Sequence, residues 1–311
     1  MTLASCDSRK TAGENPFFTE WDTPHGVPPF DKILPEHFMP AFERGMSLHE
    51  AEIDAITSNK DEATFENTIL AYDNAGQMLA QTELVFGMLC AAETNDRMQA
   101  LQEQAMPLLA AHRDKIRLDD KLFVRVKEVY DRRAALGLDA EQMRLLQKTY
   151  DSFVRAGALL DAEQKARLKE INGQLSLTAV KFGNNILAEN NNFVLELKSD
   201  ELDGLPAGIR DAAREKAQQM GKGDKWVFTL HKPSLIPLLT YSTRRDLREK
   251  IYKAYLNRCN NGDEYDNKQL INDFIRLRTE KAHLLGYPSY AAYVVDDEMA
   301  GTTDAVYGLL E

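Results

Sequence analysis

Residues 139–157 read DAEQMRLLQKTYDSFVRAG, and this stretch carries the pattern that decides the fold. Within it, apolar and small side chains recur every three or four residues, which places them on one face of a helix. Asp139 stands where an N-cap carboxylate would accept backbone N–H bonds. The stretch therefore predicts a helix over 140–157 that packs one face in a core. That face consists of Leu145, Thr149, Phe153 and Ala156.

The same spacing continues on both sides of this stretch. It starts after Pro35 with Phe38, Phe42 and Met46, and Asp161 supplies a second N-cap carboxylate. Polar breaks separate the periodic segments, so the chain is expected to be mainly α. Besides 140–157, helices are predicted at about 64–91, 95–116, 120–135 and 162–188.

A small sheet element interrupts the helical pattern. Phe193–Leu197 and Trp226–Leu230 are the two convincing strands, with a helical segment from Ile209 to Met220 between them. We therefore expect a strand-helix-strand insertion near 193–230, within residues 191–232. Pro233–Leu239 is expected to be a turn. Helices then resume at Thr243, include 266–285, and begin again at Thr303 after the break Gly286-Tyr287-Pro288.

The N-terminal region has a different character. Residues 23–30 contain three prolines, which predict an extended segment laid along a surface, with folded structure starting after it. Residues 1–14 are expected to be disordered. Leu3-Ala4-Ser5-Cys6 has the form of a bacterial lipobox, in which Cys6 would be lipidated. The alternative is an ordinary cytoplasmic N-terminus, so cytoplasmic and envelope-anchored periplasmic locations both stay open.

Composition narrows the function classes. The 311 residues include 43% hydrophobic and 28% charged residues, enough to build real cores. A net charge of −11 repels a phosphate backbone, so we expect no nucleic-acid partner. No apolar run is long enough to predict a transmembrane segment. Cys6, Cys90 and Cys259 are too few and too scattered for a disulfide framework or a structural zinc cluster.

Local motifs reveal no catalytic or metal-binding residue. A helical zinc-peptidase motif needs two histidines four residues apart, and the nearest match is His49-Glu50-Ala51-Glu52-Ile53. Ile53 cannot bind a metal, so His49 is expected to face solvent. Gly221–Lys225 is expected to be a turn before a strand, since it lacks the phosphate-loop spacing. The acidic runs 263–266 and 296–298 are expected to solvate a face or favour a helix dipole.

Two blocks of sequence carry a family resemblance. The first joins Asn15-Pro16-Phe17 to the segments 27–33 and 35–43. The second runs from Pro237-Leu238-Leu239-Thr240-Tyr241-Ser242 to Met299-Ala300 and includes Leu284-Leu285-Gly286-Tyr287. In order and spacing these blocks resemble the thimet oligopeptidase family of zinc metallopeptidases, in its peptidyl-dipeptidase (dipeptidyl carboxypeptidase) and oligopeptidase A branch.

The resemblance implies a nearly all-helical, two-lobed fold around a narrow channel. It also implies a monomeric enzyme that cleaves short peptides with a zinc-bound water. In the family, the His-Glu-x-x-His helix and the third zinc ligand lie in the C-terminal half, which would follow Glu311. We therefore expect residues 1–311 to be an N-terminal fragment that binds no zinc and is inactive alone. Cys259 stands where many relatives have glycine.

The resemblance also suggests a division of the chain and leaves two other functions open. The expected parts are 1–14, a helical domain over 15–190, the insertion at 191–232, and the helical start of the catalytic region over 233–311. The helices at 266–285 and from Thr303 should expose apolar faces. The alternatives to a peptidyl-dipeptidase are an oligopeptidase A-like endopeptidase and a non-catalytic helical scaffold or binding module.

Overall fold

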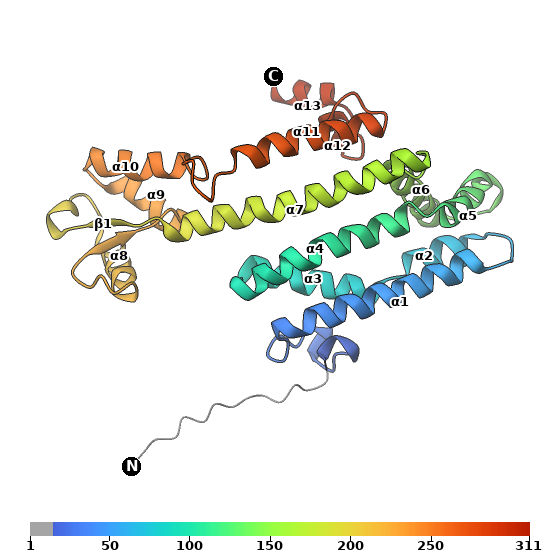
Figure 1. Ribbon diagram of the computed structural model, residues 1–311, viewed down its shortest axis with the longest axis horizontal. Helices are drawn as coiled ribbons and strands as arrows, with labels where there is room; N and C mark the ends of the chain where they lie inside the picture. Colours follow the sequence, from blue (N-terminus) through green and yellow to red (C-terminus); the bar gives the residue numbers. More distant parts are fainter. Residues whose placement is uncertain (1–14) are drawn as a thin grey trace, which may run out of the picture. The chain divides into compact units, whose positions relative to one another are not determined.

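A computed structural model describes residues 15–311 (Figure 1). Its structure is mainly α with one two-stranded sheet among these residues, which confirms the predicted fold class. The chain divides into two units, unit 1 ending at Leu177 and resuming over Leu277–Glu311, and unit 2 comprising Thr178–Arg276. Between residues 15 and 311, no helix combines the length and apolar character needed to cross a membrane. The sequence-based boundaries at 14, 190 and 232 stay predictions.

Unit 1 is built from helices whose starts are fixed by polar caps. At the start of α6, Asp139 Oδ1 accepts the Gln142 amide at 2.9 Å, and the Gln142 side chain accepts the Asp139 amide in return. Asp161 makes the same exchange with Gln164 at the start of α7. Both predicted N-caps are thus confirmed. The helices are α1 (Phe38–Ser58), α2 (Ala71–Asp73), α3 (Gln77–Ala92), α4 (Asp96–Arg117), α5 (Asp120–Asp131), α6 (Ala140–Ala156), the first part of α7 (Ala162–Asn192), the end of α11 (Lys268–Leu284), α12 (Tyr290–Val295) and α13 (Thr303–Leu310).

Unit 1 has two apolar cores. The first lies among α1, α3 and α4, where the rings of Phe38 and Phe86 meet edge to face at 4.9 Å between centroids. The second lies among α1, α5, α6 and the segment 65–70, around the fully buried Phe153 and Leu146. Phe153 therefore packs as its periodicity predicts.

The predicted helix over 64–91 is wrong as one continuous element. Phe65–Leu70 is a π-helical turn, and α2 ends at Asp73 before the chain turns and restarts as α3. Gly76 makes this turn with a left-handed φ of 73°, and its N–H donates to Glu52 Oε2 at 2.7 Å. The break therefore depends on a carboxylate from α1, a contact that local periodicity does not reveal.

The proline-rich N-terminal region also differs from the prediction. Pro16–Phe18, Pro24–Gly26 and Pro35–His37 each form a single 3-10 turn, which proline permits at a first helical position. Folded structure starts before residues 23–30, not after them, because Phe17 is only 5% exposed and packs against Phe38. The aromatic side chain contributes its apolar area to the first core of unit 1.

Unit 2 contains the predicted strand-helix-strand insertion. β1 (Leu195–Leu197) and β2 (Trp226–Phe228) pair antiparallel, with Glu196 opposite Val227. α8 (Ala207–Gln219) connects them and packs on β2, and α9 (Lys232–Tyr241) and α10 (Arg245–Leu256) follow. One apolar core joins these elements around Leu197 and Phe228.

Pro233–Leu239 is helical, which corrects the predicted turn. Pro233 occupies the first turn of α9, where its fixed φ suits a helix and its missing N–H would have had no helical partner. Pro237 lies further inside, and Leu235 and Leu238 are both buried in the core of unit 2. Burial of this apolar face outweighs the loss of one backbone hydrogen bond at Pro237.

Two helices expose apolar side chains, as the sequence predicts. Ile275 on α11 is 61% exposed, and Leu309 on α13 is 86% exposed. Isolated exposed apolar residues are common on protein surfaces, but neighbours repeat the pattern on each helix. Those neighbours are Ile271, Tyr307 and Leu310.

Gly76→Ala is expected to destabilise unit 1 by about 1–3 kcal/mol, because alanine is strained at a positive φ. A Cβ there would also approach His49 Nδ1 to 2.9 Å. Gly87→Ala is the matched control, since Gly87 lies inside α3 with open space around it and should be neutral or stabilising. Urea unfolding of both variants measures the difference. Equal stabilities would contradict the assigned role of Gly76.

Candidate functional site

Aspartates of the two acidic runs, 263–266 and 296–298, accept hydrogen bonds from basic residues. Arg155 donates to Asp296 Oδ2 at 2.6 Å, and Lys148 pairs with Asp297 Oδ1 at 2.6 Å. In the other run, Asp266 accepts the Lys268 amide at the start of α11, as an acid near a helix start is expected to do. These carboxylates stabilise the fold. Cys6 lies outside the described residues, and its lipidation stays a prediction.

The two described cysteines lack the features of an activated nucleophile. Cys259 is buried, and burial together with the nearby Glu189 carboxylate raises the pKa of its thiol to about 11. Burial also raises the pKa of Cys90. Cys259 has a left-handed φ of 54°, a backbone conformation that glycine adopts more readily than other residues.

His49 does not face solvent, contrary to the sequence-based expectation. It is half-buried, and its Nδ1 shares a hydrogen bond with His112 Nε2 at 3.0 Å. His112 comes from α4 and is only 5% exposed. The two residues are 63 positions apart, and no local motif links them. The contact joins α1 to α4 beside Gly76.

Charged neighbours surround this histidine pair. Glu50 Oε1 lies 3.4 Å from His112 Nδ1, and its other oxygen pairs with Lys115 at 2.8 Å. Burial lowers the pKa of His112, although Glu50 acts in the opposite direction. Burial and the neighbouring His112 lower the pKa of His49. Both rings are therefore neutral near pH 7. In the hydrogen bond between them, one ring then donates its N–H and the other ring's nitrogen accepts it.

The described residues do not fit a zinc site. A catalytic zinc needs three protein ligands, and residues 15–311 contain no group of three His, Cys, Asp or Glu side chains placed to hold a metal. In the histidine pair, the two facing nitrogens bond to each other. No catalytic step through zinc can be assigned to these side chains.

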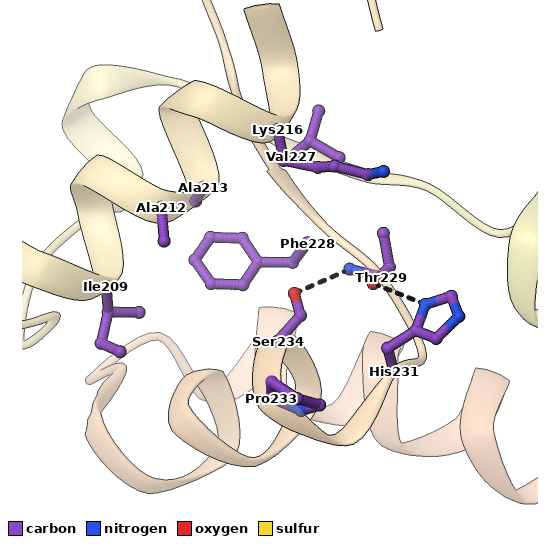
Figure 2. Close-up of a pocket in the computed structure, with 10 residues that line it drawn as sticks. All are labelled: Ile209, Ala212, Ala213, Lys216, Val227, Phe228, Thr229, His231, Pro233 and Ser234. Atoms are coloured by element: carbon purple, nitrogen blue, oxygen red, sulfur yellow. Dashed lines mark hydrogen bonds between the residues drawn. The ribbon is translucent and has the colours of Figure 1, made fainter. Parts of the chain in front are cut away.

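Unit 2 contains a pocket of about 410 Å³ between α8, β2 and the start of α9 (Figure 2). Its lining is mostly apolar, and the ring of Phe228 lies in the middle of the view. The polar side chains include one amine, one imidazole and two hydroxyls. The lining residues are Ile209, Ala212, Ala213, Lys216, Val227, Phe228, Thr229, His231, Pro233 and Ser234.

Hydrogen bonds fix the start of α9 against the end of β2. Ser234 Oγ accepts the Thr229 amide at 3.0 Å, and Thr229 Oγ1 lies 3.2 Å from His231 Nδ1. Ser234 is thus bonded to the backbone of Thr229, and His231 to the side chain of Thr229. The two residues are therefore not hydrogen-bonded to each other as a nucleophile and its base would be. The arrangement suits binding. Sequence reasoning missed the pocket because it took the start of α9 for a turn.

Comparisons with known proteins give a consistent family assignment. A sequence model of Peptidase family M3 matches residues 238–311. Dipeptidyl carboxypeptidase of Escherichia coli K12 is 36% identical over 297 residues, which cover 95% of this chain and 44% of that protein. The Salmonella typhimurium protein of the same name is 34% identical with the same coverage. Oligopeptidase A of E. coli K12 is 26% identical, over 93% of this chain and 43% of that protein.

The chain belongs to peptidase family M3, the thimet oligopeptidase family of metallopeptidases, as the resemblance in its sequence predicts. Within that family it falls in the branch of dipeptidyl carboxypeptidase and oligopeptidase A. The family is zinc-dependent in general. The chain spans less than half the length of these curated relatives.

The histidine pair predicts a loss of stability in mild acid. Because the folded-state pKa of His49 and of His112 lies below the ordinary value of 6.5, the unfolded chain binds these protons first as the pH falls. The stabilisation is full above about pH 6.5 and is lost as the pH falls toward the lowered pKa values.

Urea unfolding between about pH 7.5 and about pH 5.5 measures this loss. The double variant His49→Gln/His112→Gln keeps polar groups at both positions and should show a shallower fall in the free energy of unfolding. His283→Gln, at an exposed histidine, is the control and should keep the parent's slope. An unchanged slope in the double variant would contradict the assignment.

Proposed function

We propose that the chain is the N-terminal part of a zinc-dependent peptidyl-dipeptidase, which removes dipeptides from the C-terminus of short peptides. The observation that carries the proposal is the 36% identity to dipeptidyl carboxypeptidase across 95% of the chain. The identity to oligopeptidase A over a similar length is 26%. The difference favours a peptidyl-dipeptidase over an oligopeptidase A-like endopeptidase.

In this proposal the zinc ligands lie outside residues 1–311. The sequence has no His-Glu-x-x-His motif, and the described donor groups do not fit zinc. Zinc would supply an activated water in the whole enzyme. The helices described above would form part of the body that supports the peptide-binding channel.

The coding sequence and two peptide substrates test this proposal. The reading frame after Glu311 should encode a His-Glu-x-x-His motif. The whole protein from its native source should release a dipeptide from an N-blocked tetrapeptide with a free C-terminus. C-terminal amidation of the same peptide should abolish this release, because a peptidyl-dipeptidase requires the terminal carboxylate. Residues 1–311 alone, as the matched control, should cleave neither peptide.

The possible results separate the alternatives. Equal cleavage of the free and amidated peptides, or cleavage inside longer peptides, would indicate an endopeptidase instead. A native protein with no zinc motif and no activity would support a non-catalytic scaffold and contradict the proposal. Cleavage by residues 1–311 alone would show that the zinc assignment is wrong.

A further inference from the structure

The sequence contains two Asn-Gly pairs, and the structure places them in opposite environments. Asn172-Gly173 lies inside α7, where the Gly173 N–H donates to the carbonyl four residues before it. Asn261-Gly262 lies in the loop 257–267 between α10 and α11, and both of its residues are exposed. In such a pair the glycine nitrogen can attack the asparagine side-chain amide, because glycine has no Cβ to shield that nitrogen. The reaction requires backbone freedom, which a helix denies and an exposed loop provides.

Contacts hold the side chain of Asn172 at both ends. Its Nδ2 donates to Asp114 Oδ1 at 2.8 Å, and its Oδ1 accepts the Lys281 ammonium at 2.7 Å. The amide is therefore directed toward its partners on α4 and α11, and the helix holds the next backbone nitrogen in place. Asn172 is thus an internal reference with the same sequence motif and no freedom to react.

Two carboxylates hold the Asn261-Gly262 pair when the loop is closed. Asn261 Nδ2 donates to Glu189 Oε1 near the end of α7, and the Gly262 N–H donates to Asp266 Oδ2 at 2.8 Å. Both bonds are at the surface, and a Cβ placed on Gly262 would meet no atom within 4 Å. Water therefore reaches these bonds, and the pair can open without unfolding the helices on either side.

Glu189 makes the Asn261 side chain part of the connection between the loop and α7. Its Oε2 accepts the Cys259 N–H at 2.5 Å, and its Oε1 accepts the amide of Asn261. A carboxylate at position 261 would have no N–H to donate and would face Glu189 with the same charge. The other end of the loop has a separate anchor, because Asn267 is only 2% exposed and donates to the Phe182 carbonyl. A change at 261 would therefore release the first part of the loop alone.

We propose that Asn261 is a site of spontaneous deamidation, and that its product releases the loop from Glu189. The Gly262 nitrogen loses its proton and bonds to Asn261 Cγ, while the side-chain nitrogen leaves as ammonia, which yields a cyclic succinimide. Water then opens either carbonyl–nitrogen bond of the ring and gives aspartate or isoaspartate. The step needs no oxidant, metal or enzyme. This inference does not rest on the proposed function, because neither zinc nor a peptide substrate takes part.

Peptide mapping of the purified, folded chain tests the reaction. After incubation in mildly alkaline buffer, trypsin releases the two pairs in separate peptides, 259–268 and 170–181. Mass spectrometry should show the gain from replacing an amide NH₂ by OH, located at Asn261 by fragmentation. Conversion at Asn261 should be at least about tenfold faster than at Asn172, because the exposed loop opens more readily than α7.

Hydrogen exchange tests the consequence for the loop. Asn261→Asp reproduces the product charge and should speed exchange of the Cys259 N–H about tenfold, because its acceptor is displaced. Asn260→Asp is the matched control, since Asn260 Oδ1 accepts the Lys268 ammonium at 3.0 Å and a carboxylate there gains an ion pair. Adding Glu189→Gln to Asn261→Asp should restore slow exchange. The glutamine can donate Nε2 to the aspartate and still accept the Cys259 N–H on Oε1.

Several results would overturn the proposal. Equal conversion of Asn261 and Asn172, or an intact Asn261 after a synthetic peptide 259–268 has fully converted, would contradict the deamidation site. Equal exchange in Asn261→Asp and Asn260→Asp would contradict the release of the loop. So would continued fast exchange in the double variant, with circular dichroism melts verifying that each variant is folded. None of these results depends on whether the whole protein is a zinc peptidase.

Discussion

Unit 1 depends on contacts between two distant parts of the chain. Residues 277–311 pack against helices that precede residue 178 in the sequence. The Arg167 guanidinium of α7 donates to both oxygens of Glu280 on α11, at 2.6 and 2.9 Å. Next to it, Lys281 donates to Asn172, which in turn donates to Asp114 of α4. Because Leu277 and Ala282 are buried on the same helix, the polar contacts fix the register of an apolar interface. Residues 277–311 belong to unit 1 for this reason.

This closure accounts for much of the charge in the C-terminal region. Asp296 and Asp297, which a sequence reader would examine as cation ligands, instead accept hydrogen bonds from Arg155 and Lys148 of α6. Lys281 is half-buried, and burial lowers its pKa, while burial raises the pKa of its neighbour Asp114. Such groups stabilise the packed state and are not available to a ligand.

Features set by neighbours in sequence could be predicted from the sequence. Asp139 and Asp161 cap helices through bonds to residues three positions later, and Phe193–Leu197 and Trp226–Leu230 contain the paired strands. The resemblance to the thimet oligopeptidase family could also be recognised from the sequence. Contacts between distant segments were not: Glu52 ends a helical run at Gly76, and His49 meets His112 across two helices. The pocket required the helix that begins at Lys232, and the buried Leu235 and Leu238 stabilise that helix despite its prolines.

The central proposal is that, in this member of peptidase family M3, residues 15–311, the part that the structure describes, hold no catalytic zinc ligands. Its most direct test is the zinc content of the purified chain, measured by elemental analysis after incubation with zinc and dialysis. We predict far less than one zinc per chain and no increase in the unfolding temperature on zinc addition, because no three ligands converge among the described residues. One tightly bound zinc per chain, with a raised unfolding temperature, would contradict the claim.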